Sequence, residues 1–413
     1  MQTYIFDKTN DTDIAFYQIR ERLITLLRSR FTTYGYKQIQ TPTFEPYDLY
    51  TTVNGTIKLD EMIKVIDNSG KVLVMRPDVT IPITQQIASK YKHLSKEIRY
   101  FYVTDVFRQT PDESNNKERT QAGIEYFGNN SPEADAEVLS LAVHLLKDLH
   151  LTNFTLEIGH AGFTKELISE LALSDQDLKQ FKQLIQAKNT NGIKLFLADL
   201  SIDPKLRYAI ENIPLLYGEA DDVIKRAKEI AYNDSMVNKL QNLEEVCTVI
   251  QAYGCKQHIV IDLGLINHMD YYSDIIFQGF TENVGKPILM GGRYDKLATQ
   301  FNASIPAIGF ACDIEALLDS TKNHTKSYQP PIDVDIYYET DEQEYGLTIA
   351  NELREQNYRV LTFPIPEANK HESAQCTLYL TRNNSTLYQQ NKSWSFTDIE
   401  KLNQILQEVK ERI

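Results

Sequence analysis

The chain has 413 residues, of which 42% are hydrophobic and 24% are charged, with a formal net charge of -14 and a pI near 5.1. This length predicts two or three domains, and the acidic balance argues against a dedicated nucleic-acid binder, which usually presents a basic surface. The sequence contains neither a run of about eighteen apolar residues that could span a membrane nor the apolar stretch of a secretory signal. We therefore expect a cytoplasmic protein.

In the first 160 residues, the periodicity predicts a helix and then mostly strands. Polar residues 11–13 precede apolar residues on one helical face, and Gly35 is placed to end that helix. Residues 62–75 predict a hairpin, because two β-rich runs flank the turn signal Asn68-Ser69-Gly70. The further elements predicted here are strands at 99–108 and 118–128, a helix at 132–149 and a strand at 154–158.

The middle of the chain is predicted to be helical. Residues 164–253 carry Leu, Ile and Lys at helical spacing throughout, which indicates a helical insertion that supports the core and carries no chemistry. The elements predicted after it are strands at 258–263 and 271–280, a turn at Gly291-Gly292 leading into a helix, a strand at 305–312 and a helix from about Asp313.

A linker and a small second domain are predicted at the C-terminal end. Residues 320–331 are polar and end in Pro330-Pro331, a boundary signal that would close a core domain over residues 1–319. The elements predicted beyond the linker are a strand, a helix, two strands and a closing helix, at 332–338, 344–355, 359–363, 376–380 and 396–413. This pattern predicts a small α/β domain over residues 332–413.

The four cysteines and the few histidines give no sign of a metal site. The cysteines are Cys247, Cys255, Cys312 and Cys376, and their spacing fits neither zinc binding nor a dense disulfide framework. We therefore expect reduced, buried thiols, with no metal and no cofactor.

Polar residues gather first at Met75-Arg76-Pro77-Asp78-Val79-Thr80, a predicted strand-to-helix junction. Asp78 could accept a hydrogen bond from an ammonium group, with Thr80 in support. Helix capping by either side chain is the simpler interpretation, and spacing alone favours it.

A second cluster lies on the predicted strand at 118–128. Gln121, Gly123 and Glu125 share one face because side chains alternate along a strand. The glycine between two polar side chains would leave room for a small ligand to lie on the sheet. An ordinary solvent-facing strand explains the same pattern and is favoured by the pattern alone.

A third cluster joins Asp270-Tyr271-Tyr272-Ser273 to Gly291-Gly292-Arg293-Tyr294-Asp295. Adjacent tyrosines on a strand point to opposite faces, so only one of the pair would line a pocket with its hydroxyl. The two glycines would permit close approach of the backbone. A tight turn with core aromatics is the alternative.

Taken together and in this order, these segments resemble the class II histidyl-tRNA synthetase family over residues 34–318. The matching segments are Gly35-Tyr36 through Thr41-Pro42-Thr43-Phe44-Glu45, Phe107-Arg108 to Phe127-Gly128, Met269-Asp270-Tyr271-Tyr272, Gly291-Gly292-Arg293-Tyr294-Asp295 and Gly309-Phe310-Ala311-Cys312-Asp313-Ile314-Glu315. The resemblance implies an α+β fold, an antiparallel sheet flanked by helices, with a homodimer interface at the first of these segments.

Three positions depart from the synthetase pattern. Thr110 stands where the family has Glu, Asn267-His268 where it has Arg-Gly, and Ala316 where it has Arg. The resemblance implies that the family's residues hold or activate ATP. Losing one such donor costs about 2.7–4 kcal/mol of transition-state stabilisation, so we expect activation of histidine to be negligible.

The positions that hold the amino acid in the family are better kept. The resemblance implies that Asp78 takes the α-amino group and that Glu125 and Tyr272 take the two imidazole nitrogens, with the carboxylate favouring the protonated ring. The histidine-binding residues implied in this way are Asp78, Thr80, Arg108, Gln121, Glu125, Tyr271 and Tyr272.

A kept pocket without the ATP groups resembles the synthetase paralogue that serves as regulatory subunit of ATP phosphoribosyltransferase. Three segments fit that paralogue more closely than the synthetases, namely Arg76-Pro77-Asp78-Val79-Thr80, Thr120-Gln121-Ala122-Gly123-Ile124-Glu125 and Ile158-Gly159-His160-Ala161-Gly162. The resemblance implies a subunit without catalytic activity. It would act at the first step of histidine biosynthesis in a hetero-octamer with a short catalytic subunit that histidine feedback-inhibits.

Two other functions stay open on the sequence. An active or degenerate histidyl-tRNA synthetase would show histidine-dependent ATP–pyrophosphate exchange, and a stand-alone histidine or tRNA sensor would not associate with the transferase. Residues 331–413 stand in the place of the synthetase anticodon-binding domain without a clear match to it. We therefore do not expect tRNA binding. The sequence leaves open whether inhibitory histidine binds in the pocket or at a subunit interface.

Overall fold

The computed structural model describes residues 14–53, 57–109, 117–266, 271–282, 284–321, 332–365, 374–382, 384–390 and 392–410. The chain divides into two compact units, Met1–His324 and Thr325–Ile413. No helix in these described segments is long and apolar enough to cross a membrane.

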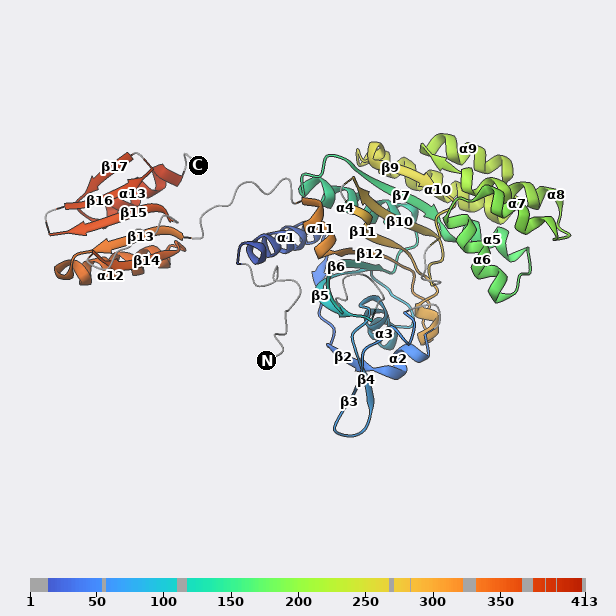
Figure 1. Ribbon diagram of the computed structural model, residues 1–413, viewed down its shortest axis with the longest axis horizontal. Helices are drawn as coiled ribbons and strands as arrows, with labels where there is room; N and C mark the ends of the chain where they lie inside the picture. Colours follow the sequence, from blue (N-terminus) through green and yellow to red (C-terminus); the bar gives the residue numbers. More distant parts are fainter. Residues whose placement is uncertain are drawn as a thin grey trace, which may run out of the picture. The chain divides into compact units, whose positions relative to one another are not determined.

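A nine-stranded sheet forms the centre of the first unit (Figure 1). Its strands, in sheet order, are β1 (Lys37–Gln38), β5 (Ile98–Phe107), β6 (Glu118–Phe127), β12 (Ala307–Asp313), β11 (Val284–Arg293), β10 (Ile275–Thr281), β7 (Phe154–His160), β9 (Ile259–Asp262) and β8 (Tyr217–Gly218). Two pairings, β1 with β5 and β7 with β9, are parallel and the others are antiparallel. The predicted antiparallel sheet is therefore confirmed in its main part, with parallel pairing near its edges.

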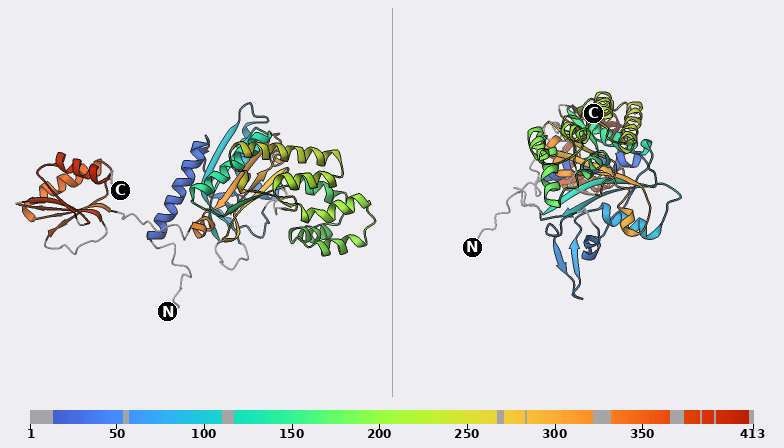
Figure 2. Two further views of the ribbon diagram at one scale, coloured as in Figure 1. Left: turned by 90° about the horizontal axis from the view of Figure 1, so that it is seen from above. Right: turned by 90° about the vertical axis from the view of Figure 1, so that its right-hand side faces the viewer.

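One face of this sheet is covered by helices (Figure 2). These helices are α1 (Ile14–Thr33), α4 (Pro132–Asp148), α10 (Asp234–Ala252) and α11 (Ile314–Thr321). Ser131 caps α4 by accepting a hydrogen bond from the backbone N–H of Ala134, and Pro132 occupies the first turn, where its missing N–H costs nothing. Gly35, at a φ of +80°, follows the end of α1 as predicted. Residues 11–13, the predicted cap of α1, lie outside the described residues.

The opposite face carries a smaller layer. Its elements are the three-stranded sheet β2 (Phe44–Pro46), β4 (Val72–Met75) and β3 (Lys64–Ile66), the helices α2 (Tyr47–Thr51) and α3 (Thr80–Lys90), and the 3-10 turn η4 (Ala298–Phe301). The hairpin predicted at 62–75 is confirmed as β3 and β4. A core that includes Tyr102, Tyr272 and Tyr294 packs on this side of the large sheet.

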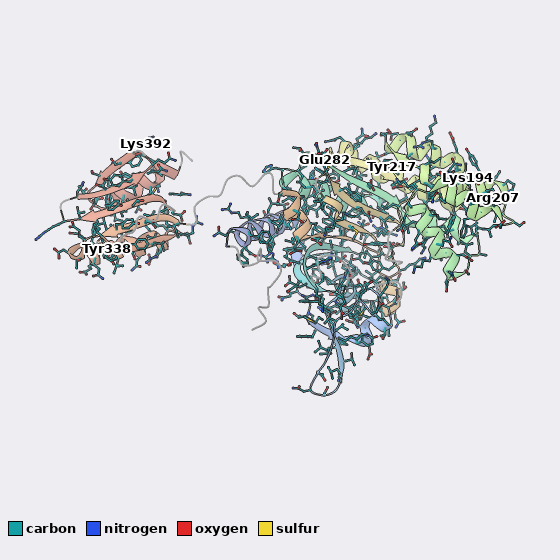
Figure 3. All side chains as sticks on the ribbon, viewed as in Figure 1. Lys194, Arg207, Tyr217, Glu282, Tyr338 and Lys392 are labelled. Carbon is teal, nitrogen blue, oxygen red and sulfur yellow. The ribbon has the colours of Figure 1, made fainter. Side chains whose placement is uncertain are left out.

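The helical insertion gathers at one end of the first unit (Figure 1). Its elements before α10 are α5 (Ala161–Ser169), α6 (Asp175–Gln186), α7 (Thr190–Ala198), α8 (Pro204–Asn212), η2 (Ile213–Leu215) and α9 (Ala220–Ile230). Lys194 and Arg207 mark two of these helices in Figure 3. The prediction of helix throughout 164–253 is wrong at β8, because Gly218 has a φ of +135°, which no right-handed helix uses.

The turn predicted at Gly291-Gly292 is also wrong. Both glycines lie inside β11, and the next short helical element is η4 rather than an α-helix. A Cβ atom at Gly292 would lie 2.6 Å from the carbonyl oxygen of Ile275 on the neighbouring strand. Glycine is needed here because the two backbones pack closely, and not because the chain turns.

The second unit is a separate α/β fold. Its sheet order is β14 (Val360–Pro364), β13 (Ile332–Tyr338), β15 (Ala374–Thr381), β16 (Asn384–Gln389) and β17 (Lys392–Phe396), and its helices are α12 (Gln343–Glu355) and α13 (Ile399–Lys410). The predicted strand, helix and two following strands are confirmed. The hairpin of β16 and β17 was not predicted, and the closing helix begins at Ile399 because residues 392–396 form a strand.

Candidate functional site

A cavity of about 260 Å³ lies over the central sheet of the first unit, against β6, β11 and β12. All seven residues predicted to bind histidine line it, namely Asp78, Thr80, Arg108, Gln121, Glu125, Tyr271 and Tyr272. They come from segments far apart in the sequence, which only the folded chain brings together. Their role as histidine ligands stays a prediction.

Asp78 both caps a helix and lines the pocket. Its buried side chain accepts a hydrogen bond of 2.8 Å at Oδ1 from the backbone N–H of Ile81, in the first turn of α3. Its Oδ2 lies 4.0 Å from Nη2 of Arg108. Burial raises the pKa of Asp78, and the nearby Arg108 charge opposes the shift. The capping interpretation is therefore confirmed, and one carboxylate oxygen stays on the pocket side.

Glu125 projects from β6 with only 2% of its surface exposed. The hydroxyl of Thr80 donates a hydrogen bond of 2.5 Å to its Oε1, and the hydroxyl of Tyr294 donates to its Oε2. Burial raises the pKa of Glu125 to about 8, although both hydrogen bonds favour the charged form. Near neutral pH this carboxyl is therefore mostly protonated and can exchange a proton with an imidazole.

Tyr271 and Tyr272 both line the pocket, which corrects the prediction that only one of them would. They precede β10, which begins at Ile275, so the alternation of a strand does not apply to them. Their ring centroids lie 4.8 Å apart, and burial raises the pKa of both hydroxyls. Both phenols therefore stay neutral and act as hydrogen-bonding groups.

The space over Gly123 is not free for a ligand. Tyr102 is the cross-strand partner of Gly123 in the pairing of β5 with β6. A Cβ atom at Gly123 would lie 2.5 Å from the Tyr102 hydroxyl and 2.6 Å from the carbonyl oxygen of Phe310. The predicted role of Gly123 is thus wrong in its detail, because the glycine accommodates a tyrosine of the same sheet.

Arg108 and Gln121 stand nearer the start of β6 than Glu125 does. Nε of Arg108 donates a hydrogen bond of 2.7 Å to the carbonyl oxygen of Pro77, which fixes the guanidinium beside the start of α3. Gln121 is half-buried and pairs in register with Asp313 on β12. Both side chains line the same cavity as Asp78.

The positions linked to lost ATP chemistry have different outcomes. Thr110 and Asn267-His268 lie outside the described residues. Ala316 is fully buried in the core beneath the sheet and does not line the pocket. The pocket therefore receives no charged side chain from that position.

Two groups of lining residues were not predicted. Tyr102 and Tyr294 supply buried hydroxyls, while a second group supplies charges at Lys117, Arg119, Lys286 and Asp313. Tyr294 belongs to a segment that the sequence analysis singled out, Gly291-Gly292-Arg293-Tyr294-Asp295. In the structure Nε of the neighbouring Arg293 donates a hydrogen bond of 2.8 Å to Asp135 on α4, which anchors the end of β11. No sequence motif indicated the four charged residues, because only the pairing of separate strands brings them together.

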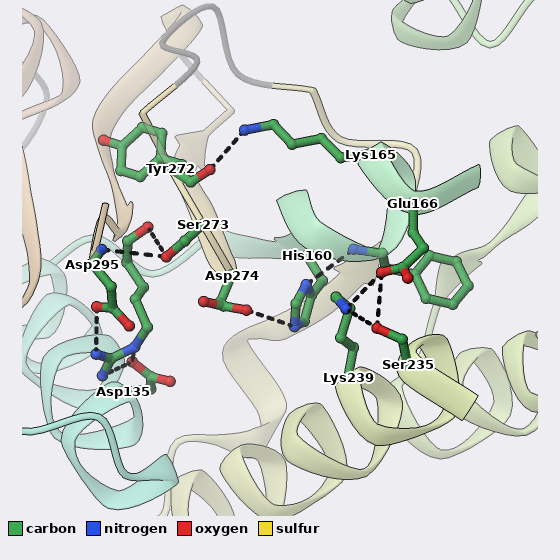
Figure 4. Close-up of polar contacts among 12 residues, drawn as sticks. Asp135, His160, Lys165, Glu166, Ser235, Lys239, Tyr272, Ser273, Asp274 and Asp295 are labelled. Atoms are coloured by element: carbon green, nitrogen blue, oxygen red, sulfur yellow. Dashed lines mark hydrogen bonds and ion pairs between the residues drawn. The ribbon is translucent and has the colours of Figure 1, made fainter. Parts of the chain in front are cut away.

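Behind the tyrosine pair lies a second, more open cleft (Figure 4). Nζ of Lys165, on α5, donates a hydrogen bond of 2.8 Å to the carbonyl oxygen of Tyr272. His160 accepts a hydrogen bond at Nδ1 from the backbone N–H of Phe163, and its Nε2 lies 4.0 Å from Asp274. Burial lowers the pKa of His160, so the ring is neutral at pH 7. The hydrogen bond from Lys165 thus connects the insertion to the main chain of a pocket residue.

The described part of the chain contains no group of three or more His, Cys, Asp or Glu side chains that could hold a metal ion. The four cysteines are free thiols, and three of them are buried.

A family model described as Histidyl-tRNA synthetase matches residues 9–317. The chain is 44% identical to an ATP phosphoribosyltransferase regulatory subunit from Oceanobacillus iheyensis, over 94% of this chain and 95% of that protein. It is 34% identical to a protein of the same name from Ruminiclostridium cellulolyticum, over 82% of this chain and 81% of that protein.

Solved structures show the same fold. An ATP phosphoribosyltransferase regulatory subunit/histidyl-tRNA synthetase from Bacillus halodurans superimposes with a TM-score of 0.79 at 25% identity, covering 92% of this chain and 99% of that one. A histidyl-tRNA synthetase from Nostoc sp. gives a TM-score of 0.79 at 18% identity over 96% of each chain, which is a likeness of fold alone.

Proposed function

Because this chain belongs to the family of ATP phosphoribosyltransferase regulatory subunits, which is built on the histidyl-tRNA synthetase fold, we propose that it binds free histidine in the pocket around Glu125 and transmits that signal to a separate catalytic subunit. As a regulatory subunit it does not itself transfer the phosphoribosyl group. Its partner is the catalytic subunit that the family name implies.

The observation that supports histidine is the pair of buried carboxyls, those of Asp78 and Glu125, which line one cavity at different positions. Asp78, beside Arg108, suits the ammonium group of an amino acid, and Arg108 with Gln121 suits its carboxylate. Glu125 and Tyr272 then face the side chain of the ligand. A carboxyl and a phenol can bond opposite nitrogens of one imidazole ring.

The pKa of Glu125 sharpens this preference. A carboxyl with a pKa of about 8 is able to give its proton to a bound ring or to accept a hydrogen bond from it. Lysine and arginine would bring a full charge into the same buried space, and pairing that charge would require the Glu125 carboxyl, protonated near neutral pH, to ionise against the cost of desolvation. Leucine would leave the hydroxyls of Thr80 and Tyr294 and the Glu125 carboxyl without a polar ligand group.

The assembly is also part of the proposal. The regulatory chain would form a homodimer through the segment that contains β1 and β2, where Phe44 is 50% exposed. It would join a short-form catalytic subunit in a hetero-octamer in the cytoplasm, at the first step of histidine biosynthesis. Histidine bound in the pocket would favour the inhibited assembly by having a higher affinity for it than for the active one.

The test is reconstitution with a short catalytic subunit. We expect the wild-type chain to co-elute with that subunit, to raise its turnover, and to make the turnover sensitive to histidine. The variant Glu125→Gln should co-elute and activate, but should need at least tenfold more histidine for inhibition. Glu170→Gln, at an exposed position at the end of α5 and outside the pocket, should behave as wild type.

Three results would contradict the proposal. The first is failure to associate with the catalytic subunit, and the second is inhibition by histidine that Glu125→Gln leaves unchanged. The third is robust histidine-dependent ATP–pyrophosphate exchange by the chain alone, which would show an active synthetase.

A further inference from the structure

Arg76 is a buried cation, 3% exposed, that does not itself line the pocket. It directly follows β4, and Pro77 and Asp78 come next in the chain. We propose that Arg76 is a positioning residue that sets the place of the Asp78 carboxyl, and that this makes the pocket select ligands with an ammonium group. The inference rests on the proposed function, in which Asp78 receives the ammonium group of histidine.

The guanidinium of Arg76 joins two separate parts of the chain. Nη1 donates hydrogen bonds of 2.7 Å and 2.9 Å to the carbonyl oxygens of Thr41 and Pro42, just before β2. Nη2 donates hydrogen bonds of 2.5 Å to the hydroxyl of Thr104 and 2.7 Å to the carbonyl oxygen of Asp105, both on β5. Because the donors of a guanidinium point in fixed directions, these contacts set the orientation of the side chain as well as its position.

The main chain of Arg76 is held as well. Its N–H donates a hydrogen bond of 2.8 Å to the carbonyl oxygen of Thr43, and its carbonyl oxygen accepts one of 2.9 Å from the N–H of Phe107. Arg76 is therefore fixed at both ends, between the segment that leads into β2 and the strand β5 of the central sheet.

The connection from Arg76 to Asp78 is short and stiff. The ring of Pro77 fixes its own φ near about -65° and restricts the residue before it to extended backbone. The carbonyl oxygen of Pro77 accepts a hydrogen bond of 2.7 Å from Arg108, and Oδ1 of Asp78 accepts one of 2.8 Å from the N–H of Ile81. A displacement of Arg76 would reach the Asp78 carboxyl, because the bonds between them have little freedom to absorb it.

The effect on selectivity follows from where the two ends of the ligand are bound. A binding group has to be held within roughly 0.5 Å of its productive position by the residues that support it. Asp78 depends on Arg76 for this support, whereas Glu125 and Tyr272, proposed to contact the ring, belong to β6 and to the segment before β10. Loss of the Arg76 contacts should therefore weaken recognition of the ammonium group and spare recognition of the imidazole ring.

The test is calorimetric titration of the full chain with three ligands that share an imidazole ring. Histidine and histidinol carry an ammonium group, and imidazolepropionate lacks it. Arg76→Lys keeps the charge, but its one nitrogen cannot reach both parts of the chain. The affinities for histidine and histidinol should fall roughly fivefold or more, and that for imidazolepropionate by less than about twofold, since only the bond to the ammonium group is disturbed.

A second variant and a measurement without ligand complete the test. Thr104→Val removes one acceptor of Arg76 at nearly constant volume, so it should give the same split between ligands at a smaller size. In Arg76→Lys the Asp78 carboxyl should bond the N–H of Ile81 less firmly. Hydrogen exchange in a peptide that covers residues 78–84 should then be roughly threefold faster than in the wild type.

The matched control is Arg207→Lys in the insertion (Figure 3). Nη2 of Arg207 donates a hydrogen bond of 2.9 Å to the carbonyl oxygen of Leu200, and neither residue lines the pocket. This variant should leave the three affinities and the exchange of residues 78–84 unchanged.

The inference is overturned if Arg76→Lys weakens histidine and imidazolepropionate equally, or if it changes neither the affinities nor the exchange. A wild type that binds no histidine would contradict the proposed function. The exchange measurement would then still decide whether Arg76 positions Asp78, because it needs no ligand.

Discussion

Thr80 donates a hydrogen bond of 2.5 Å from its hydroxyl to Oε1 of Glu125, across 45 positions of sequence. Thr80 is the first residue of α3 and Glu125 lies on β6, so the bond joins a helix start to the central sheet. A change in the charge of Glu125 therefore acts directly on the position of α3.

The stability of the chain should depend on pH through Glu125. Its pKa is raised from 4.5 to about 8 in the folded chain. An acid that holds its proton more tightly when folded stabilises the fold at low pH, and this contribution is lost as pH rises from about 4.5 through about 8. The unfolding free energy of the wild type should fall relative to that of Glu125→Gln over this range, by up to about 1.4 kcal/mol per pH unit. Urea unfolding at several pH values measures the difference.

Glu170→Gln provides the reference for that experiment, because Glu170 is exposed. Its difference from the wild type should stay flat over the same pH range. An equally flat difference for Glu125→Gln would show that the carboxyl titrates normally in the folded chain.

The affinity for histidine should pass through a maximum with pH. Bound histidine needs one proton shared between its ring and Glu125. Below about pH 6.5 the free histidine ring and the Glu125 carboxyl each carry a proton, so one proton must be released on binding. Above about pH 8 neither group carries a proton, so one proton must be taken up on binding. Affinity should fall up to tenfold per pH unit on either side. Calorimetry in buffers of different ionisation enthalpy would count the protons, and a flat profile would exclude the shared proton.

Tyr294→Phe should weaken histidine binding and move its alkaline limb. The hydroxyl of Tyr294 donates to Oε2 of Glu125 and lowers the pKa of that carboxyl. Its removal should cost about 1–3 kcal/mol in the buried network and raise the pKa of Glu125 further. The fall in affinity at high pH should then begin at a higher pH. Tyr208→Phe, at a position 61% exposed, should change neither quantity.

Gly309→Ala should damage the pocket without adding charge. A Cβ atom at Gly309 would collide with Oε2 of Glu125 and with the carbonyl oxygen of Ile124. Overpacking of this kind costs roughly 1–3 kcal/mol, and relief by movement of Glu125 would break its bond to Tyr294. Gly285→Ala is the control, because a Cβ atom there meets nothing within 4 Å. Thermal unfolding and histidine titration would both detect the difference, and equal behaviour of the two variants would contradict the prediction.

The long strands of the fold could be predicted from sequence because their residue types agree with their environment. The strand predicted at 99–108 is β5 (Ile98–Phe107), rich in Tyr, Phe and Val, and the hairpin partner predicted at 118–128 is β6 (Glu118–Phe127). The hairpin of β16 and β17 escaped prediction because its sequence is mostly polar and its stability comes from pairing with β15. Local preference does not encode that pairing.

The candidate site divides in the same way. Asp78 and Glu125 were found because their motifs resemble those of a known family, and the structure places both in one cavity. The convergence of Arg119 and Lys286 depends on β12 lying between β6 and β11, a sheet order that no short motif contains. Tyr271 was assigned to a strand that begins at Ile275, since a Tyr-rich run looks like β structure until its hydrogen bonds are known.

Lys165 bonds the carbonyl oxygen of Tyr272, so it supports the main chain of a lining residue without being one of the side chains that line the pocket. Lys165 belongs to the insertion and reaches the main chain behind the aromatic pair. Two relatives with identical lining side chains but different insertions would therefore share a ligand and differ in the concentration at which they respond to it. Under the proposed function, substitutions in the surface helices of the insertion would shift the histidine concentration at which the subunit responds and leave the lining side chains unchanged.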